Sequence, residues 1–584
     1  MKGKSVKFDL SADKLLDIAE EKLDKEEYLP ALRFLHKSIE LYGPAVDEYA
    51  DLAEAYEGIE VYEQAIDCWF QYLDLCAEEE AVDAYEGLAA CYYNVGNEPQ
   101  AMIYYKKMLS DKYFSPENSL DLNGMFDREE SAPARFRVSW PPEKADHTGE
   151  LSEGVRLLRE GQMQKAEETF LRVPKDSAQY PAAQNYLAVS CLLQGDSARA
   201  ETICRALLET EPDNVQALST YAAVLAEQER PQEGRAVAEK LAAIHTDNPD
   251  ELYKIATVCC ENHLYEEALE KFRILSGTVR YDRTLLFFKG VAALRCGKLQ
   301  ESLSAFGTIL DVWPDAEVAR YYYDAVREFS EGKTSLPDLG FFYRLPKAER
   351  EGRVRLLKAL LSLPVAELHA YCTQTDLQPL LRWCFDEEDG QLPDLQMLAL
   401  AVAERADMRS FLADVLLKST VNDVIKVEAV YRICCRNRAF ECGVVLANDY
   451  HKIGFDRLQT GRKKHKIFVQ AYAQCIARFS LFGDGAGEEY RQAAQALYAA
   501  AESAGALDGL KAENITATLY YAVSPFAKMR GDDVLRILKA DPESVAHLQE
   551  IAASWRQIAS EAAATEASAA EVSAAEEEKD DETH

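Results

Sequence analysis

The sequence predicts an all-α protein, an α-α solenoid of stacked helical hairpins followed by a C-terminal all-helical domain. Three observations predict this fold. Small residues recur at a fixed step of 34 residues in two parallel series, glycines and prolines mark helix ends within each step, and apolar residues keep a helical spacing after the repeats end. With 584 residues, of which 48% are hydrophobic, the chain is long enough to bury several cores.

The small residues define the repeat. One series consists of Ala166, Ala200, Gly234, Ala268 and Ser302. A second series runs twelve residues ahead of it and consists of Gly154, Ala188, Ala222, Ala256 and Gly290. Upstream, two shorter series have steps of 34 and then 36 residues, with Ala19, Ala53 and Ala89 in one and Ala31, Ala65 and Ala101 in the other. Helices approach closely only where side chains are small, so the pattern predicts eight hairpins, three in a first array and five in a second.

Glycine and proline residues predict where the helices of a repeat end. Four glycines fall at one equivalent place, where the first helix of a hairpin must end in a left-handed residue: Gly96, Gly161, Gly195 and Gly297. Pro212 and Pro314 stand where the second helix must stop. These residues predict two helices and a tight turn in each unit.

By these residues the chain resembles the tetratricopeptide repeat family, whose unit is a 34-residue helix-turn-helix. Some positions of the family's repeat favour aromatic or large apolar residues. Here these positions hold Tyr49, Tyr56, Trp69, Tyr85, Tyr92 and Tyr105. Later units depart from the pattern, since smaller residues take such positions at Cys191, Cys204, Ala238 and Cys259. The resemblance covers about half the chain. It implies a right-handed superhelix whose concave wall is lined by the first helix of each unit and holds partner proteins.

The expected order of domains follows from these patterns. We expect three repeat units at 1–112, a Pro-rich linker at 113–148, five units and a capping helix at 149–330, a connecting loop at 331–347, a C-terminal helical domain at 348–559 and a disordered Ala/Glu-rich acidic tail at 560–584. The C-terminal domain shows no repeat period, so it is either a decayed continuation of the solenoid or an independent bundle.

No motif for catalysis, a cofactor or a metal ion occurs. The sequence lacks the Cys and His spacings of zinc sites, a phosphate-binding loop and a nucleophile motif, although a triad assembled from distant residues would escape this method. No run of about 18 apolar residues predicts a membrane span. The start of the chain lacks the apolar segment of a secretory signal, so we expect a cytoplasmic protein.

The family resemblance implies groove residues in both arrays. In the first array these are Asp13, Glu20, Asp47, Glu54, Asp83, Glu86 and Tyr93, and in the second they are Asn185, Val189, Tyr253, Phe287 and Arg295. Residues 1–110 contain 24 Asp and Glu against 10 Lys and Arg, so the first wall is expected to be acidic. It either selects basic partners or is merely a solvated surface. The second wall is mostly apolar.

A basic patch interrupts this acidic chain. Residues 426–478 contain 11 Lys and Arg against 4 Asp and Glu, centred on Arg462, Lys463, Lys464 and Lys466. This patch could dock on the acidic first array, bind nucleic acid or be a solvated helix entrance.

The function predicted from these features is a non-catalytic protein–protein interaction scaffold or adaptor that binds partner peptides or helices in the concave groove. The alternative is a regulatory protein whose C-terminal domain binds nucleic acid or a small molecule while the repeats serve as a docking arm. The net charge of −35 disfavours nucleic acid and anionic membranes as partners and favours basic peptides or helices. The oligomeric state stays open.

Overall fold

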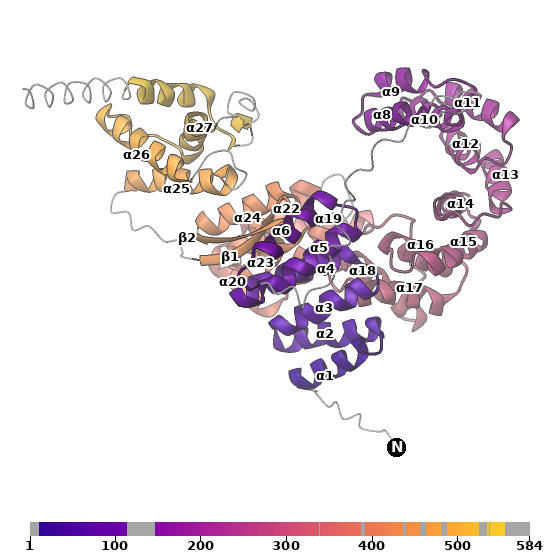
Figure 1. Ribbon diagram of the computed structural model, residues 1–584, viewed down its shortest axis with the longest axis horizontal. Helices are drawn as coiled ribbons and strands as arrows, with labels where there is room; N and C mark the ends of the chain where they lie inside the picture. Colours follow the sequence, from indigo (N-terminus) through magenta and orange to yellow (C-terminus); the bar gives the residue numbers. More distant parts are fainter. Residues whose placement is uncertain are drawn as a thin grey trace, which may run out of the picture. The chain divides into compact units, whose positions relative to one another are not determined.

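Helical hairpins build most of this protein, which is described by a computed structural model (Figure 1). The structure describes residues 11–113, 146–337, 339–386, 392–435, 440–455, 463–480, 487–524, 534–536 and 538–554. Most of the predicted linker and the predicted acidic tail therefore lie outside the described residues. The chain forms two compact units, and the first of them consists of Met1–Tyr62, Ser115–Arg350 and Asp386–Gly390.

The first unit contains a short and a long run of helices. The short run is α1 (Ala12–Leu23), α2 (Tyr28–Tyr42) and α3 (Val46–Gly58). The long run is α8 (Thr148–Arg159), α9 (Met163–Phe170), α10 (Tyr180–Leu193), α11 (Ser197–Thr210), α12 (Val215–Glu227), α13 (Pro231–Ala242), α14 (Pro249–Glu261), α15 (Tyr265–Thr278), α16 (Arg283–Arg295), α17 (Leu299–Val312) and α18 (Glu317–Ser330). From α8 to α18 each helix packs on the next, and the first helices of successive hairpins also touch from α8 to α14. Figure 1 shows α8 to α17 around an arc, with the first helix of each hairpin on its inner side. The predicted solenoid of hairpins is confirmed.

Close helix crossings occur where the sequence places small residues. Every member of the two series in the second array is buried. A Cβ atom added to Gly154 would lie 2.3 Å from the ring of Phe170, and one added to Gly290 would lie 2.9 Å from the ring of Phe306. Such distances are shorter than van der Waals contact, so these crossings admit only small residues. The predicted register is confirmed.

The predicted turns are present as well. Gly161, Gly195 and Gly297 end the first helices of their hairpins with φ angles of 75°, 80° and 72°. Glu229 and His263 take the same place in the other two hairpins, and their φ angles of 54° and 61° are also left-handed. A side chain in this conformation costs about 1–2 kcal/mol. Stacking of the hairpins therefore imposes the turn even where glycine is missing.

The short run of helices docks on α17 within the first unit. The Arg33 guanidinium donates two hydrogen bonds to Asp311, at 2.9 and 2.6 Å. The Tyr56 hydroxyl donates to the carbonyl of Val312 at 2.8 Å, and the Nε2 atom of His36 lies 2.9 Å from that hydroxyl. Because the hydroxyl proton is already committed, a neutral His36 donates to it from Nε2. Burial lowers the pKa of His36 to about 4, which fits this neutral form.

The second unit contains the rest of the helices and one β-hairpin. Its elements are α4 (Tyr62–Leu75, from Glu63), a 3-10 turn (Glu78–Glu80), α5 (Ala81–Asn94), α6 (Glu98–Ser110), α19 (Lys347–Ser362, from Glu351), α20 (Val365–Gln374), α21 (Gln378–Asp386, to Phe385), α22 (Leu392–Arg405), α23 (Arg409–Leu417), α24 (Asp423–Cys435), β1 (Phe440–Leu446), β2 (Asp449–Phe455), α25 (Lys463–Arg478), α26 (Gly487–Ser503) and α27 (Ala512–Val523). The boundary between the units thus falls inside the first predicted array.

The β-hairpin was not expected in a region predicted to be all-helical. Strands β1 and β2 pair in antiparallel register, with Phe440 opposite Phe455. The two turn residues, Ala447 and Asn448, have left-handed φ angles of 51° and 61°, which match the right-handed twist of the strands. Asparagine tolerates this conformation, but alanine does not favour it, so the local sequence carries only a weak hairpin signal.

Helix α6 holds the tip of this hairpin. The carbonyl of Asn448 accepts hydrogen bonds from the Gln100 amide at 2.7 Å and from the Tyr104 hydroxyl at 2.9 Å. Lys107 forms an ion pair with Asp449. These contacts tie residues of the first predicted array to the C-terminal part of the chain.

A larger side chain at a predicted crossing should destabilise the second array. Ala188→Leu overfills the contact around a fully buried residue and should cost about 1–3 kcal/mol. Ala198→Leu, on the exposed face of α11, is the matched control and should change the stability little. Thermal melting of both variants measures the difference, and equal melting temperatures would contradict the register.

The pKa of His36 should make the first unit weaken in mild acid. Its folded pKa of about 4 lies below the ordinary value of 6.5, so the unfolded chain binds more protons between these two values. Stability is then lost as the pH falls from 6.5 to 4, by about 3 kcal/mol in total. Urea unfolding of wild type and His36→Gln between pH 7.5 and 4.5 measures this loss. Equal pH dependence in both proteins would exclude His36 as its source.

Candidate partner-binding surfaces

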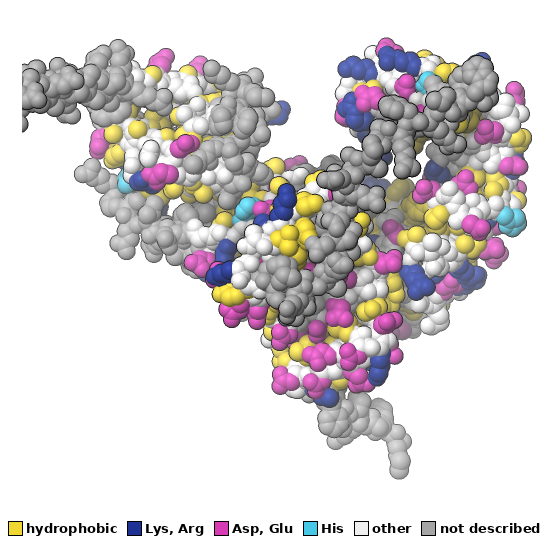
Figure 2. All heavy atoms as spheres, in the orientation of Figure 1, with side chains coloured by type: hydrophobic (Ala, Val, Ile, Leu, Met, Phe, Trp, Pro, Cys, Tyr) yellow, Lys and Arg dark blue, Asp and Glu magenta, His cyan; other side chains and the backbone are white. Residues whose placement is uncertain are grey.

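Carboxylates crowd on one face of α1 and α3 in the first unit. Figure 2 shows Asp and Glu side chains gathered over these helices. Asp51 is half-buried at the centre, and burial raises its pKa to about 6, with further contributions from Glu20, Glu54, Asp47 and Glu48. One of its oxygens is buried without a hydrogen-bond partner among the described residues. We call Glu20, Asp47, Asp51 and Glu54 the acidic wall.

The predicted residues of the first groove are divided between the two units. Asp13, Glu20, Asp47 and Glu54 are exposed in the first unit. Asp83, Glu86 and Tyr93 lie on α5 in the second unit, where Asp83 and Tyr93 are exposed and Glu86 is half-buried. Sequence reasoning missed Asp51, although it follows Asp47 by four residues and precedes Glu54 by three, which is the spacing of one helix face.

Two of the residues predicted to line the second groove, Asn185 and Val189, lie on α10. Asn185 is only 1% exposed, and its carbonyl oxygen accepts a hydrogen bond of 2.8 Å from the Thr220 hydroxyl. Its Nδ2 atom is buried and has no hydrogen-bond partner in the described part of the chain. Val189 is half-buried one turn further along α10. The prediction that Asn185 lines the open groove is therefore wrong, because this side chain is buried against Thr220, whereas Val189 is partly exposed.

The other end of this wall holds a segment of the chain itself. Phe287 was predicted to line an open groove, but it is fully buried, and its ring lies 5.2 Å from that of Tyr343. Arg295, also predicted to line the groove, donates a hydrogen bond of 2.7 Å to the carbonyl of Leu339. The guanidinium of Arg283 lies 4.7 Å from the centre of the Tyr343 ring. Since Arg283 begins α16 and Arg295 ends it, the segment runs antiparallel to this helix.

The covering segment, Leu339–Leu345, is anchored at several points. Leu339, Tyr343 and Leu345 are almost fully buried. The Tyr322 hydroxyl donates to the carbonyl of Arg344 at 2.8 Å, and the Tyr343 hydroxyl donates to Asp386 at 3.0 Å. The prediction that Phe287 lines an open surface is therefore wrong, because this segment covers its ring. Arg295 remains exposed, but its hydrogen bond to Leu339 ties it to the covering segment.

An aromatic row leads from the covering segment to the open wall. The ring of Phe341 lies 5.9 Å from that of Phe288, which in turn stacks on Tyr253 at 6.3 Å. Tyr253 is 37% exposed. The row therefore ends at a tyrosine that presents part of its ring to solvent on α14.

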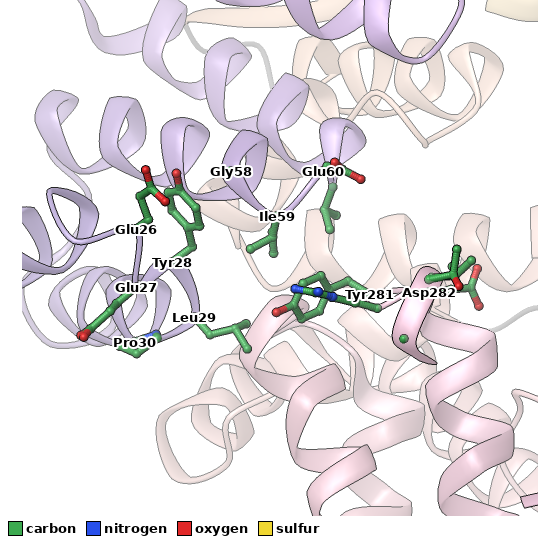
Figure 3. A pocket seen from close by; sticks show the side chains of 15 residues that line it. Glu26, Glu27, Tyr28, Leu29, Pro30, Gly58, Ile59, Glu60, Tyr281 and Asp282 are labelled. Atoms are coloured by element: carbon green, nitrogen blue, oxygen red, sulfur yellow. The ribbon is translucent and has the colours of Figure 1, made fainter. Parts of the chain in front are cut away.

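A cleft of about 1090 Å³ separates the short run of helices from the α15–α16 loop within the first unit (Figure 3). The α1–α2 turn, the end of α3 and the α15–α16 loop form its walls. Its lining residues are Glu26, Glu27, Tyr28, Leu29, Pro30, Gly58, Ile59, Glu60, Val61, Gly277, Thr278, Val279, Arg280, Tyr281 and Asp282. Sequence reasoning missed this cleft because it depends on how α2 docks on α17.

Part of the basic region is paired with carboxylates where the structure describes it. Arg462 and the side chain of Lys463 lie outside the described residues, whereas Lys464 and Lys466 are exposed. Lys464 pairs with Asp508 at 2.7 Å. Elsewhere in residues 426–478, Arg432 pairs with Glu404 and Glu428, Arg478 pairs with Glu428, and Lys426 is buried.

Among the described residues, no group of three or more His, Cys, Asp or Glu side chains is placed to hold a metal ion. No described helix combines the length and the apolar character needed to cross a membrane.

The raised pKa of Asp51 should weaken the first unit as the pH rises. The folded pKa of about 6 exceeds the ordinary value of 3.8, so the folded state binds the proton more tightly, and stability is lost between pH 4 and 6. Asp51→Asn should therefore be more stable than wild type at pH 7.5, by about 1 kcal/mol once solvent screening is allowed for. Urea unfolding checks this. The control Asp247→Asn, in an exposed loop, should behave like wild type.

No protein-family model matches the sequence, and no curated protein matches it. Solved structures of tetratricopeptide repeat proteins match parts of it. YrrB, described as having an unusual peptide-binding site, is 12% identical, with 31% of this chain and 92% of that chain covered and a TM-score of 0.24. A tetratricopeptide repeat protein from Parabacteroides merdae is 14% identical, with coverages of 44% and 98% and a TM-score of 0.26. Yeast Tom70 is 13% identical, with coverages of 73% and 95% and a TM-score of 0.27.

Such TM-scores add nothing to the evidence for the fold, which consists of the helix contacts of the hairpins. In hairpin length and in hairpin stacking, the chain resembles the tetratricopeptide repeat proteins.

Proposed function

We propose that this protein is a non-catalytic adaptor that binds peptide segments of partner proteins on the open wall of its second array, from α8 to α14. One observation carries the proposal: the same wall, at α16, already holds a non-helical segment of the chain itself, Leu339–Leu345. Equivalent positions of successive first helices face the same side, because the hairpins stack in register. A wall that accepts a peptide segment at one end is suited to accept another beside it.

The open wall offers apolar contacts. Tyr253 and Val189 provide apolar surface, and the partly exposed Tyr253 continues the aromatic row. The stacked helices hold these groups in place before binding, so little ordering entropy is lost by the receptor.

We propose further that the acidic wall selects basic partner segments, which places the protein's partners among basic peptides and helices. The raised pKa of Asp51 supports this: burial is its main cause, and the neighbouring carboxylates raise it further, so negative charge gathers around a partly buried position. A lysine or arginine side chain in their midst would relieve the repulsion and lower that pKa. Binding should then be sensitive to salt and should release protons near pH 6.

Nucleic-acid binding by the C-terminal region finds less support. Among the described residues of the basic patch, several cations are paired within the second unit, and the whole chain carries a charge of −35.

The open wall should lose its partners when it is made acidic. Val189→Asp/Tyr253→Asp places charges on the wall and should remove a defined subset of the proteins captured from lysate by the wild-type chain. Leu171→Asp/Ile274→Asp changes two exposed apolar residues, one directly after α9 and one on α15, and is the matched control. Quantitative mass spectrometry of the captured proteins compares the three baits. Identical partner sets would contradict the assignment of function to this wall.

A further inference from the structure

We propose that the cleft between the short run of helices and the α15–α16 loop is a second docking site, for a short partner segment in which arginine or lysine side chains alternate with apolar ones. This site lies on the turns of the hairpins. The concave wall of the second array lies on the faces of first helices, so the two sites use different residues. The proposal therefore does not depend on the function proposed for that wall.

The floor of the cleft is apolar. Ile59 and Val61, beyond the end of α3, are 9% and 7% exposed, and Leu29 and Pro30 are half-buried at the start of α2. Across the cleft, Val279 is 38% exposed. These side chains would give up most of their remaining contact with water to an apolar side chain inserted between the two walls.

The rim of the cleft is acidic. Four carboxylates line it, from Glu26, Glu27, Glu60 and Asp282, against one guanidinium, from Arg280. Glu27 pairs with Lys22, and Asp282 accepts a hydrogen bond from the backbone of α16. Among the residues that the structure describes, no ion pair involves Glu26 or Glu60. The carboxylates of Glu26 and Glu60 therefore remain available to a cationic side chain. The negative charge of the rim is complementary to the positive charge of the proposed segment.

Two tyrosines add surfaces that favour cations. Figure 3 shows Tyr28 and Tyr281 on opposite walls of the cleft. The face of a tyrosine ring attracts a guanidinium or an ammonium group. Gly58 fixes the first of these rings, because a Cβ atom at this position would lie 2.3 Å from the ring of Tyr28. This wall of the cleft is thus set before any partner arrives.

The size of the cleft favours a chain segment as occupant. Small-molecule sites usually have volumes of about 300–1000 Å³ and enclose most of their ligand. This cleft has about 1090 Å³ and lies between turns at the surface, with carboxylates at its rim. An alternating segment would place apolar side chains on the floor and cationic ones at the rim, since successive side chains of an extended chain point to opposite sides.

The test uses the full-length protein and a fluorescein-labelled octapeptide of alternating arginine and leucine, with binding followed by fluorescence anisotropy. Glu26→Lys/Glu60→Lys reverses the two available charges of the rim and should weaken binding about tenfold or more. Glu168→Lys/Glu209→Lys makes the same change in net charge at exposed positions on α9 and α11 and should weaken it less than about twofold. Circular dichroism confirms that each variant is folded.

The acidic wall supplies a further control. Asp47→Lys/Glu54→Lys tests whether the peptide binds there instead. Loss of binding in the rim variant alone supports the cleft. Equal loss in the rim variant and in the α9–α11 control, loss in the acidic-wall variant alone, or the absence of saturable binding would each overturn the proposal. Loss in the acidic-wall variant alone would at the same time support the basic-partner function proposed for that wall, so the two ideas fail separately.

Discussion

The close approach of paired helices at small residues is the constraint on which the second array depends. Gly154 and Gly290 leave room for the rings of Phe170 and Phe306, and a single added methyl group would collide with either ring. Because this crossing recurs every 34 residues, each hairpin meets the next in the same way. The inner face made by the first helices, and every residue placed on it, follows from that repetition.

The docking of the short run of helices on α17 is a second packing arrangement, and the 34-residue repeat does not encode it. The short run of helices docks on α17 through the Tyr56 hydroxyl, His36 and the Arg33–Asp311 ion pair. The aligned hydrogen bonds and the neutral histidine make this contact directional. It brings the turns of the first hairpins opposite the α15–α16 loop and so creates the cleft.

The second array holds a segment of its own chain against one end of its inner wall. Residues Leu339–Leu345 cover α16, where Phe287 and Arg295 bind them, while Tyr253 remains partly open on α14. The covered end shows which chemistry the wall accommodates: aromatic rings against aromatic rings, and backbone carbonyls against side-chain donors. Tyr253 and Val189, on the preceding helices, stay partly exposed, so the two ends of the wall differ.

The sequence by itself determined the repeat, the small residues at the crossings, the turn positions and the acidic character of α1 and α3. These features are local or strictly periodic, so one unit predicts the next. Only the tertiary structure decided that Phe287 is covered, that α5 and α6 belong with the β-hairpin, and that Asp51 lies at the centre of the carboxylates. Each of these depends on contacts between residues far apart in the chain or on burial by another element. No repeat period encodes such contacts, because they join parts of the chain that occur only once.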